Sequence, residues 1–428
     1  LFPDLGLCVD ALKVAGMYDY ALAVTRPDGS LCGMNDSAPR EGGPGLQDRL
    51  RAREHFRQHH DLPEKAPSLA QVFPDAGQAF FRDAWSEEAT YVTFDATRWG
   101  GAHCHLARNA VQVHSHGRPL IVDPGRITTE MGDPLGPYGK STRAHSTANL
   151  NGWNQMKTNP DEFRAWSGDG CAGATALYSA GYWEAPFGWW FFNGLGHGLA
   201  ARHRRILLFL HGRAIVIIDR LSRWEEKEVG PRYENPSLEL NWQLAPGTVV
   251  VDEEERRAVT GYDDANVLLM FPLVAEGMEM TIHDGEDDPP RGWIQQGDRT
   301  QQAVTAPQVA LVSNPMAGCS EEVVSVIVPF EGERQPDVTA EAGATPDKSS
   351  PGWVTLRWGD GTSDTVLWTR NLEAMIGRVG RLETDASLIY AQGGGGGETV
   401  RLVVMDGTHC AGTQVEPVVM QPCPRPTV

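Results

Sequence analysis

Short apolar or alternating runs recur along most of the chain after Gln71, and turn residues separate them, as His211-Gly212-Arg213 does between two of them. Many short strands at such intervals are typical of an all-β sandwich. The sequence therefore predicts a mostly β protein, with a large antiparallel β-sandwich over residues 70–370 and a small β appendage over residues 371–428. The expected strands cover residues 89–94, 110–116, 119–123, 204–210, 214–221, 237–244, 267–271, 323–329, 366–369 and 400–405.

The first 69 residues follow a helical pattern instead. Leu5, Val9, Leu12 and Leu22 recur at helical spacing and predict one amphipathic helix over residues 5–24, which the turn sequence at residues 26–30 ends. A second helix is expected over residues 45–59. We therefore expect a short helical segment, residues 1–69, ahead of the sandwich.

The charge of the chain is unevenly distributed. A net charge of −19 argues against general affinity for nucleic acid or other polyanions. No run of eighteen apolar residues occurs, so no membrane span is expected. The stretch from Arg98 to His145, however, contains six basic residues and three acidic ones, so its net charge is +3. This balance suits an anionic substrate, although solvated loop charges are an alternative. The six are Arg98, Arg108, Arg118, Arg126, Lys140 and Arg143.

The stretch from Trp99 to Asn149 has three features that suit a metal site. They are the pair His103 and His105, Asp123 at the end of an apolar run, and His145 beyond a loop rich in Gly and Pro. Residues i and i+2 of a strand point to one face, so the paired histidines can share a surface. Imidazoles and a carboxylate make a plausible tetrahedral zinc site with one further position. Ordinary surface or hydrogen-bonded histidines are the alternative.

The same stretch resembles the heparinase II/III-like family of polysaccharide lyases. The chain reads G-G-A-H-C-H from Gly100, H-G-R-P-L-I-V-D-P-G from His116 and S-T-R-A-H-S-T from Ser141. It departs from the family pattern at two positions. Ala107 stands where the family often has Asp, and His145-Ser146-Thr147 stands where H-N-T is common. These departures spare the metal ligands but put active-site hydrogen bonds and substrate choice in doubt.

The resemblance implies an N-terminal α/α toroid and a C-terminal antiparallel β-sandwich, with substrate in the cleft between them. It makes residues 1–69 the last helices and loop of an incomplete toroid, whose missing part carries the family's catalytic Tyr and its Asn/His pair. The chain would then be a fragment of a longer enzyme. A small helical cap on a complete protein is the alternative. The resemblance also implies a secreted or periplasmic location.

Residue roles follow from the resemblance in the same way. His105, Asp123 and His145 match the ligands of a structural zinc ion. His103 matches a cleft residue that takes part in the chemistry. Tyr138, seven residues before His145, is a second catalytic candidate by proximity alone, and packing on its own loop is an equal alternative.

The implied reaction is β-elimination on a uronic acid residue of an acidic polysaccharide or oligosaccharide. The C5 proton is hardly acidic until the neighbouring carboxylate charge is offset by cationic or hydrogen-bonding groups. Arg126 and Arg143 are the candidates for that binding role. They could instead brace the Asp-Pro-Gly turn and the entry to the next strand. A base then takes the C5 proton and an acid protonates the leaving O4. Alginate and heparan-type glycosaminoglycans both fit.

Three rival classes use similar residues. A cupin-like metal protein needs a Glu shortly after the histidine pair, and residues 106–110 contain none. A metallo-β-lactamase-like hydrolase needs H-x-H-x-D-H, and Ala107-Arg108 occupy the last two places. A non-catalytic carbohydrate-binding β-sandwich would use the same cleft without the chemistry, and the missing toroid keeps it open as an alternative.

Overall fold

The fold is described from a computed structural model of the chain. The residues described are 10–37, 44–128, 130, 132–168, 170–184, 198–223, 236–296, 302–313, 320–344, 350–372, 375–379, 381–396, 398–411 and 417–420.

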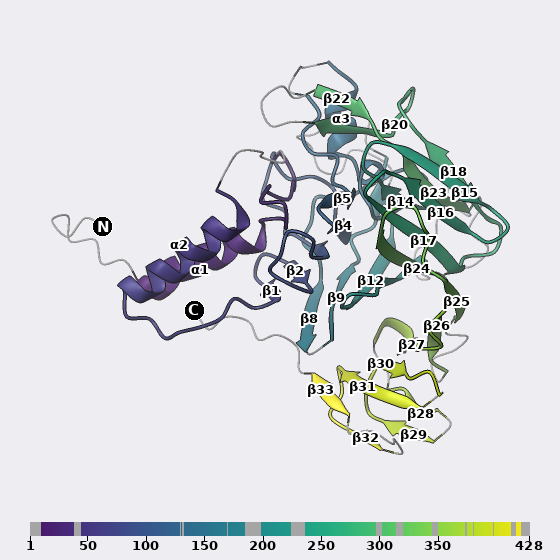
Figure 1. Ribbon diagram of the computed structural model, residues 1–428. Coiled ribbons are helices and arrows are strands. Elements are labelled where there is room, and N and C mark those ends of the chain that lie inside the picture. The colour runs from purple at the N-terminus through teal and green to yellow at the C-terminus, as the bar shows by residue number, and fades with distance from the viewer. Residues whose placement is uncertain are drawn as a thin grey trace.

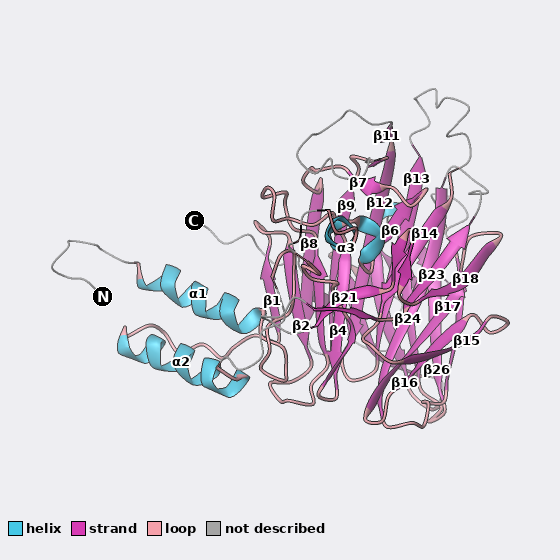
Figure 2. Ribbon diagram, turned by 90° about the horizontal axis from the view of Figure 1, so that it is seen from above, coloured by secondary structure: helices cyan, strands magenta, loops and turns pink. Residues whose placement is uncertain are grey.

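Two antiparallel-running helices, α1 (Ala11–Ala23) and α2 (Leu46–His59), lie side by side and project from the β body (Figures 1 and 2). The side chain of Asp10 caps α1 by accepting a hydrogen bond of 2.9 Å from the backbone N–H of Leu12. Where α1 meets the β body, Tyr20 packs edge-on against Phe73. Both expected helices are present, although residues 1–9 lie outside the described part. Among the described residues, no helix is long and apolar enough to cross a membrane.

An eight-stranded antiparallel sheet forms the middle layer of the molecule. Its strand order is β15 (Thr248–Asp252), β16 (Arg257–Gly261), β17 (Ala265–Leu273), β24 (Ser320–Glu331), β13 (Ala214–Arg223), β12 (Ala201–Leu210), β9 (Cys171–Tyr178) and β8 (Glu162–Gly168).

Two smaller antiparallel sheets cover one face of the middle layer, and an isolated bridge between Ile121 and Leu244 joins them. Phe94 and Trp242 of these sheets share one buried core with Leu207 and Phe209 of β12. The first sheet is β1 (Ala70–Phe73), β2 (Gln78–Arg82), β3 (Tyr91–Asp95), β4 (Ala110–Ser115) and β5 (Arg118–Ile121). The second is β18 (Met278–His283), β23 (Gln308–Ser313), β14 (Leu238–Gln243) and β6 (Ala148–Leu150).

A C-terminal sheet covers the opposite face of the middle layer (yellow and yellow-green in Figure 1). Its Trp368 and Tyr390 share a second buried core with Ile206 and Leu208 of β12. Successive residues of β12 therefore enter opposite cores, as the two-residue period of a strand requires. The sheet consists of β25 (Val338–Gly343), β26 (Gly352–Trp358), β27 (Ser363–Trp368), β30 (Leu388–Gly393), β31 (Thr399–Met405) and β33 (Val418–Met420).

The short elements complete the connections. They are α3 (Leu135–Lys140), η2 (Thr142–Ala144), β7 (Asn154–Gln155), β10 (Tyr182–Trp183), β11 (Gly198–Leu199), β19 (Glu286–Asp287), β20 (Pro290–Arg291), β21 (Trp293–Gln296), β22 (Gln302–Thr305), η4 (Arg370–Leu372), β28 (Gly377–Val379), β29 (Leu382–Thr384) and β32 (Cys410–Ala411).

The predicted fold class, a mostly β antiparallel sandwich preceded by helices, is confirmed, and each expected run overlaps a strand. The division of the chain differs from the expected one. A boundary at residue 370 would cut the C-terminal sheet in two, because β27 pairs along its whole length with β30. The C-terminal layer therefore begins near Val338, and it packs on the middle sheet as a third layer.

Replacing Leu208 by Ala tests this packing. Leu208 is fully buried between the middle and C-terminal sheets, so Leu208→Ala should lower the free energy of unfolding by about 2–5 kcal/mol. Val250→Ala is the control, because Val250 is 70% exposed and its truncation should cost less than about 0.5 kcal/mol. Urea denaturation measures both. Equal, small effects would contradict a C-terminal sheet that packs as a third layer.

Candidate metal centre

Three side chains from separate segments converge beside the middle sheet. His105 lies between β3 and β4, Asp123 follows β5, and His145 follows η2. One ligand atom from each lies within 4.8 Å of the other two. Nδ1 of His105 is 3.2 Å from Nε2 of His145, which is 3.5 Å from Oδ2 of Asp123. All three side chains are almost completely buried. The structure thus brings together the three residues that the sequence selected as metal ligands.

The converging atoms are all acceptors. Nδ1 of His145 donates to the carbonyl oxygen of Ser141 at 2.7 Å, which leaves a lone pair on Nε2. Nε2 of His105 donates to Asp36 at 3.1 Å, which leaves a lone pair on Nδ1. The other oxygen of Asp123, Oδ1, accepts the N–H of Gly125 at 2.9 Å. A cation between these atoms would offset the mutual repulsion of their lone pairs. The arrangement fits a metal ion whose histidine ligands are oriented by a carboxylate and a carbonyl.

Burial shifts the pKa values of these groups when no cation is present. Burial raises the pKa of Asp123 to about 8, against a smaller lowering by the Gly125 N–H. Burial lowers the pKa of His145 to about 3, and it also lowers the pKa of His105. Neutral imidazoles are the form that binds a metal, and a bound cation would favour the ionised carboxylate.

The two histidine loops are held by one buried arginine of the middle sheet. Arg205 of β12 donates to the carbonyl oxygens of Asn109 at 2.7 Å and Ser146 at 2.6 Å. Its guanidinium also pairs with both oxygens of Asp219 on β13, at 2.7 and 2.9 Å. Nε2 of His203 donates to the same carboxylate at 2.7 Å. Arg205, Asp219 and His203 are all fully buried, so this network fixes the loop after His105 against the loop after His145.

His103 lies outside the buried cluster. It was expected on a strand, sharing one face with His105, but both residues lie in a turn and loop between β3 and β4. The side chain of His103 is 82% exposed, whereas that of His105 is fully buried. The expected shared face is therefore wrong, because side-chain alternation at i and i+2 holds only in extended strands. The exposed position is nevertheless open to a substrate.

Asp36, in the connection between α1 and α2, was not selected from the sequence. One of its oxygens lies 2.7 Å from Nδ1 of His103, the other 3.1 Å from Nε2 of His105, and Nζ of Lys140 lies within 2.9 Å of both. Burial alone would raise the pKa of Asp36, but hydrogen bonds from His105, Lys140 and His103 hold it well below its ordinary value. Nothing local in the sequence signals this role, because its partners follow about seventy residues later or more.

The remaining predicted site residues are placed less favourably for substrate. Tyr138 is buried, and its hydroxyl accepts the N–H of Gly292 at 3.0 Å. Burial raises its pKa to about 12. Arg143 forms a two-pronged pair with Glu239, at 2.6 and 3.1 Å. Arg126 is half-buried, and within the described part of the chain no carboxylate pairs with it. These placements favour the packing alternative for Tyr138 and the bracing alternative for Arg143.

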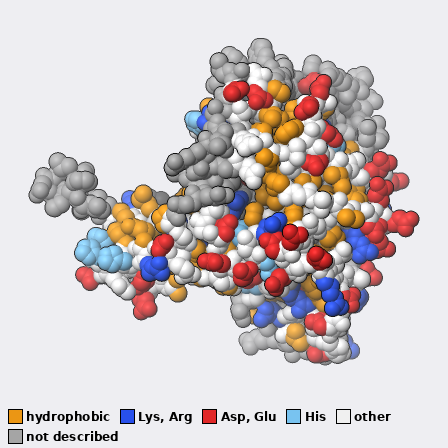
Figure 3. All heavy atoms as spheres, turned by 45° about the horizontal axis from the view of Figure 1, so that its top comes forward, with side chains coloured by type: hydrophobic (Ala, Val, Ile, Leu, Met, Phe, Trp, Pro, Cys, Tyr) orange, Lys and Arg blue, Asp and Glu red, His pale blue; other side chains and the backbone are white. Residues whose placement is uncertain are grey.

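The local excess of basic residues is reduced by pairing. Arg118 pairs with Asp264, Lys140 with Asp36 and Arg143 with Glu239. Basic and acidic side chains alternate on the face seen in Figure 3 without forming a continuous basic surface. The charge argument for an anionic substrate is therefore weaker than the sequence suggested.

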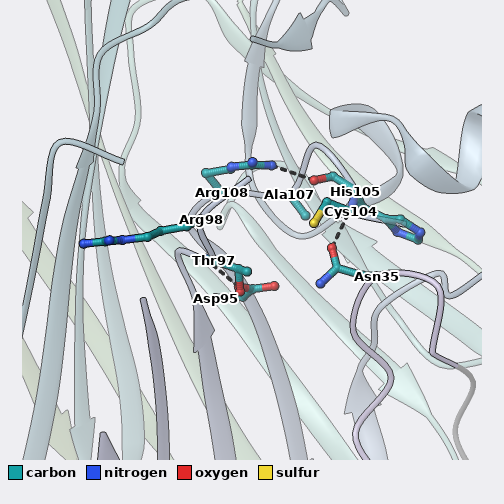
Figure 4. A pocket seen from close by; sticks show the side chains of 8 residues that line it. All are labelled: Asn35, Asp95, Thr97, Arg98, Cys104, His105, Ala107 and Arg108. Carbon is teal, nitrogen blue, oxygen red and sulfur yellow. Dashed lines mark hydrogen bonds between the residues drawn. The ribbon is translucent and has the colours of Figure 1, made fainter. Parts of the chain in front are cut away.

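A small pocket lies beside His105 (Figure 4). Arg108 lies over it, with its Nη1 donating to the carbonyl oxygen of His105 at 2.6 Å, and Asn35 Oδ1 accepts the His105 N–H at 2.7 Å. The side chain of Arg98 extends away from the other lining residues. The lining residues are Asn35, Asp95, Thr97, Arg98, Cys104, His105, Ala107 and Arg108.

Residues 65–340 match the family model described as heparinase II/III-like, C-terminal. The chain therefore belongs to the heparinase II/III-like family, which excludes the cupin-like and metallo-β-lactamase-like alternatives.

Individual relatives are distant and longer. A heparin-sulfate lyase of Pedobacter heparinus is 23% identical over 281 residues, which cover 64% of this chain and 37% of that protein. A heparin-sulfate lyase of Bacteroides stercoris is 22% identical over 227 residues, or 52% of this chain and 30% of that protein. The crystal structure of a heparan sulfate lyase from Pedobacter heparinus superposes with a TM-score of 0.65 at 19% identity, covering 84% of this chain and 53% of that one. The chain thus spans about half, or less, of the length of these relatives.

Removing the buried arginine should be costly. Arg205→Met leaves Asp219 buried without its main partner, so it should lower the free energy of unfolding by about 3–5 kcal/mol. The exposed pair Arg51–Asp48 supplies the control, since Arg51→Met should cost less than about 1 kcal/mol. Urea denaturation of the two variants makes the comparison, and similar costs would show that Arg205 does not hold the loops.

Proposed function

We propose that His105, Asp123 and His145 bind one zinc ion. The observation that carries this proposal is the convergence of three acceptor atoms within 4.8 Å in a buried site. Two imidazole nitrogens and a carboxylate oxygen are a ligand set that zinc accepts, with a water molecule or a backbone group in the fourth position. Because the site ties three separate segments together and lies below the surface, we propose that the ion is structural.

Asp123→Ala tests the zinc site. The variant leaves two ligands in place, so zinc content and melting temperature should both fall. Asp75→Ala, at an exposed aspartate of the β1–β2 turn, should change neither. Elemental analysis and thermal unfolding before and after chelation measure the effects. Wild-type protein without zinc, whose melting temperature is indifferent to a chelator, would contradict the proposal.

We propose further that the protein containing this chain is a polysaccharide lyase that cleaves a uronic-acid-containing acidic polysaccharide by β-elimination. Membership of the family and two relatives named heparin-sulfate lyase support the reaction class. A secreted or periplasmic location, where such polymers are met, belongs to the same proposal.

His103 is the described residue best placed to take part in that reaction. It is exposed, its Nδ1 is held by Asp36 at 2.7 Å, and its position in the G-G-A-H-C-H run matches the family's cleft histidine. Its Nε2 is then available to take a proton from, or to accept a hydrogen bond from, a bound sugar. Arg126, as the nearby half-buried cation, is the better of the two candidates for offsetting the substrate carboxylate.

The burial of Tyr138 favours one alternative function. Of the two catalytic candidates in this chain only His103 reaches the surface, so a β-sandwich that binds an acidic polysaccharide without cleaving it remains the second candidate. Binding of heparan sulfate or alginate without release of unsaturated uronate, which absorbs ultraviolet light, would establish this alternative.

Replacing each histidine of the pair should separate their roles. In a protein that contains this chain and is active, His103→Ala should retain zinc and folding while turnover falls on the order of 10²-fold or more. His105→Ala should instead lose zinc and thermal stability, with activity falling as a consequence. Ultraviolet product release, elemental analysis and thermal unfolding give the three readouts. A His103→Ala variant that loses its zinc would mean that the two roles are exchanged.

A further inference from the structure

The connection between α1 and α2 forms several hydrogen bonds with the loop that carries His103 and His105. Oδ1 of Asn35 accepts the N–H of His105 at 2.7 Å, and the N–H of Asp36 donates to the carbonyl oxygen of His103 at 3.3 Å. Asn35 has a left-handed backbone, with φ of 57°, which asparagine tolerates better than most residues. Nζ of Lys140 lies 2.8 Å from Asp36 Oδ1 and 3.0 Å from the carbonyl oxygen of Ala102, so Lys140 links Asp36 to the same loop.

The carboxylate of Asp36 meets the two histidines through opposite ring nitrogens. It faces Nε2 of His105 at 3.1 Å and Nδ1 of His103 at 2.7 Å. An ionised carboxylate only accepts hydrogen bonds, so each of these nitrogens must carry a proton. In a neutral imidazole the other nitrogen then holds the lone pair. That nitrogen is Nδ1 in His105, which faces His145, and Nε2 in His103, which points away from Asp36.

We propose that Asp36 is a positioning residue that fixes complementary tautomers of His103 and His105. One carboxylate thereby prepares the buried histidine to bind metal through Nδ1 and the exposed histidine to present an unprotonated Nε2 to substrate. The inference deepens the proposed function on which it rests, because it makes the helical segment part of the metal centre. Neither histidine can change tautomer without losing its bond to Asp36.

Asp36→Asn should disturb this arrangement while keeping the size of the side chain. The amide offers one acceptor oxygen and one donor nitrogen, so only one histidine can still donate to it. The other ring must accept, and its proton moves to the opposite nitrogen. If that ring is His105, the proton enters the metal position. Loss of a carboxylate that orients a metal-binding histidine typically costs 10–100-fold in metal affinity, and we expect a weakening of about this size.

The experiment combines zinc competition with nitrogen NMR of the ring atoms. The spectra are recorded at a pH of about 8.5, two units above the ordinary histidine pKa. In zinc-free wild type, His103 should be the Nδ1–H tautomer and His105 the Nε2–H tautomer. His103→Ala and His105→Ala assign the signals. In Asp36→Asn at least one ring should change tautomer, and zinc should bind about 10–100-fold more weakly.

Asp28→Asn is the matched control. Asp28 lies in the same connection and pairs with a buried histidine of the β body, His114 on β4, at 3.4 Å. Its loss should leave the tautomers of His103 and His105 and the zinc affinity unchanged. Equal weakening of zinc binding in both variants would mean that loop docking, rather than the tautomer, is responsible, and would overturn the proposal.

The wild-type spectrum keeps the proposal testable even if Asp36→Asn fails to fold. His103 with Nε2–H, or His105 with Nδ1–H, would overturn it directly. Failure of the proposed metal function gives a different result, because a wild type that binds no zinc would still show the two predicted tautomers in its zinc-free form.

Discussion

The arrangement of the candidate metal centre depends on one buried ion pair. Arg205 and Asp219 lie on adjacent strands of the middle sheet. The guanidinium of Arg205 also donates hydrogen bonds to the carbonyl oxygens of Asn109 and Ser146. A buried pair of this kind contributes little net stability over an apolar replacement, but breaking it leaves a charge without compensation. Its effect here is geometric, because it sets the distance between the loops that carry the two histidines. The third residue of the cluster, Asp123, follows β5 in the sheet that packs on the same face.

The layered fold explains why such a pair can exist. The middle sheet is covered on one face by the two smaller sheets and on the other by the C-terminal sheet, so most residues of its central strands are buried. Polar groups in that setting must find protein partners, and Arg205 satisfies carbonyl groups that the loops leave unpaired. Asp36 brings the helical segment onto the loop that carries His103 and His105. The candidate site is thus built where the helical segment meets the sandwich.

Sequence reasoning reached the fold and selected the three residues that converge in it, but it missed the groups that position them. Strand runs such as residues 204–210 are apolar enough to be recognised, whereas β9, Cys171–Tyr178, consists largely of Ala and Gly and has no strand signature. His105, Asp123 and His145 lie in recognisable motifs. Asp36 and Arg205 act on partners 69 and 96 residues away, through contacts that only the folded chain creates. For the same reason the sequence does not reveal that Arg143 pairs with Glu239, and the charge of Arg143 was counted as available to a substrate.

X-ray absorption at the zinc edge tests whether two histidines and one aspartate on these loops form a metal site. If they do, zinc should show a nitrogen and oxygen shell at about 2.0–2.1 Å with the scattering pattern of two imidazoles. Cys104 lies between the two histidines of the loop and supplies the sharpest contrast. A zinc–sulfur distance of about 2.3 Å, or an imidazole pattern that persists unchanged in a variant with both His105 and His145 replaced by Ala, would contradict it.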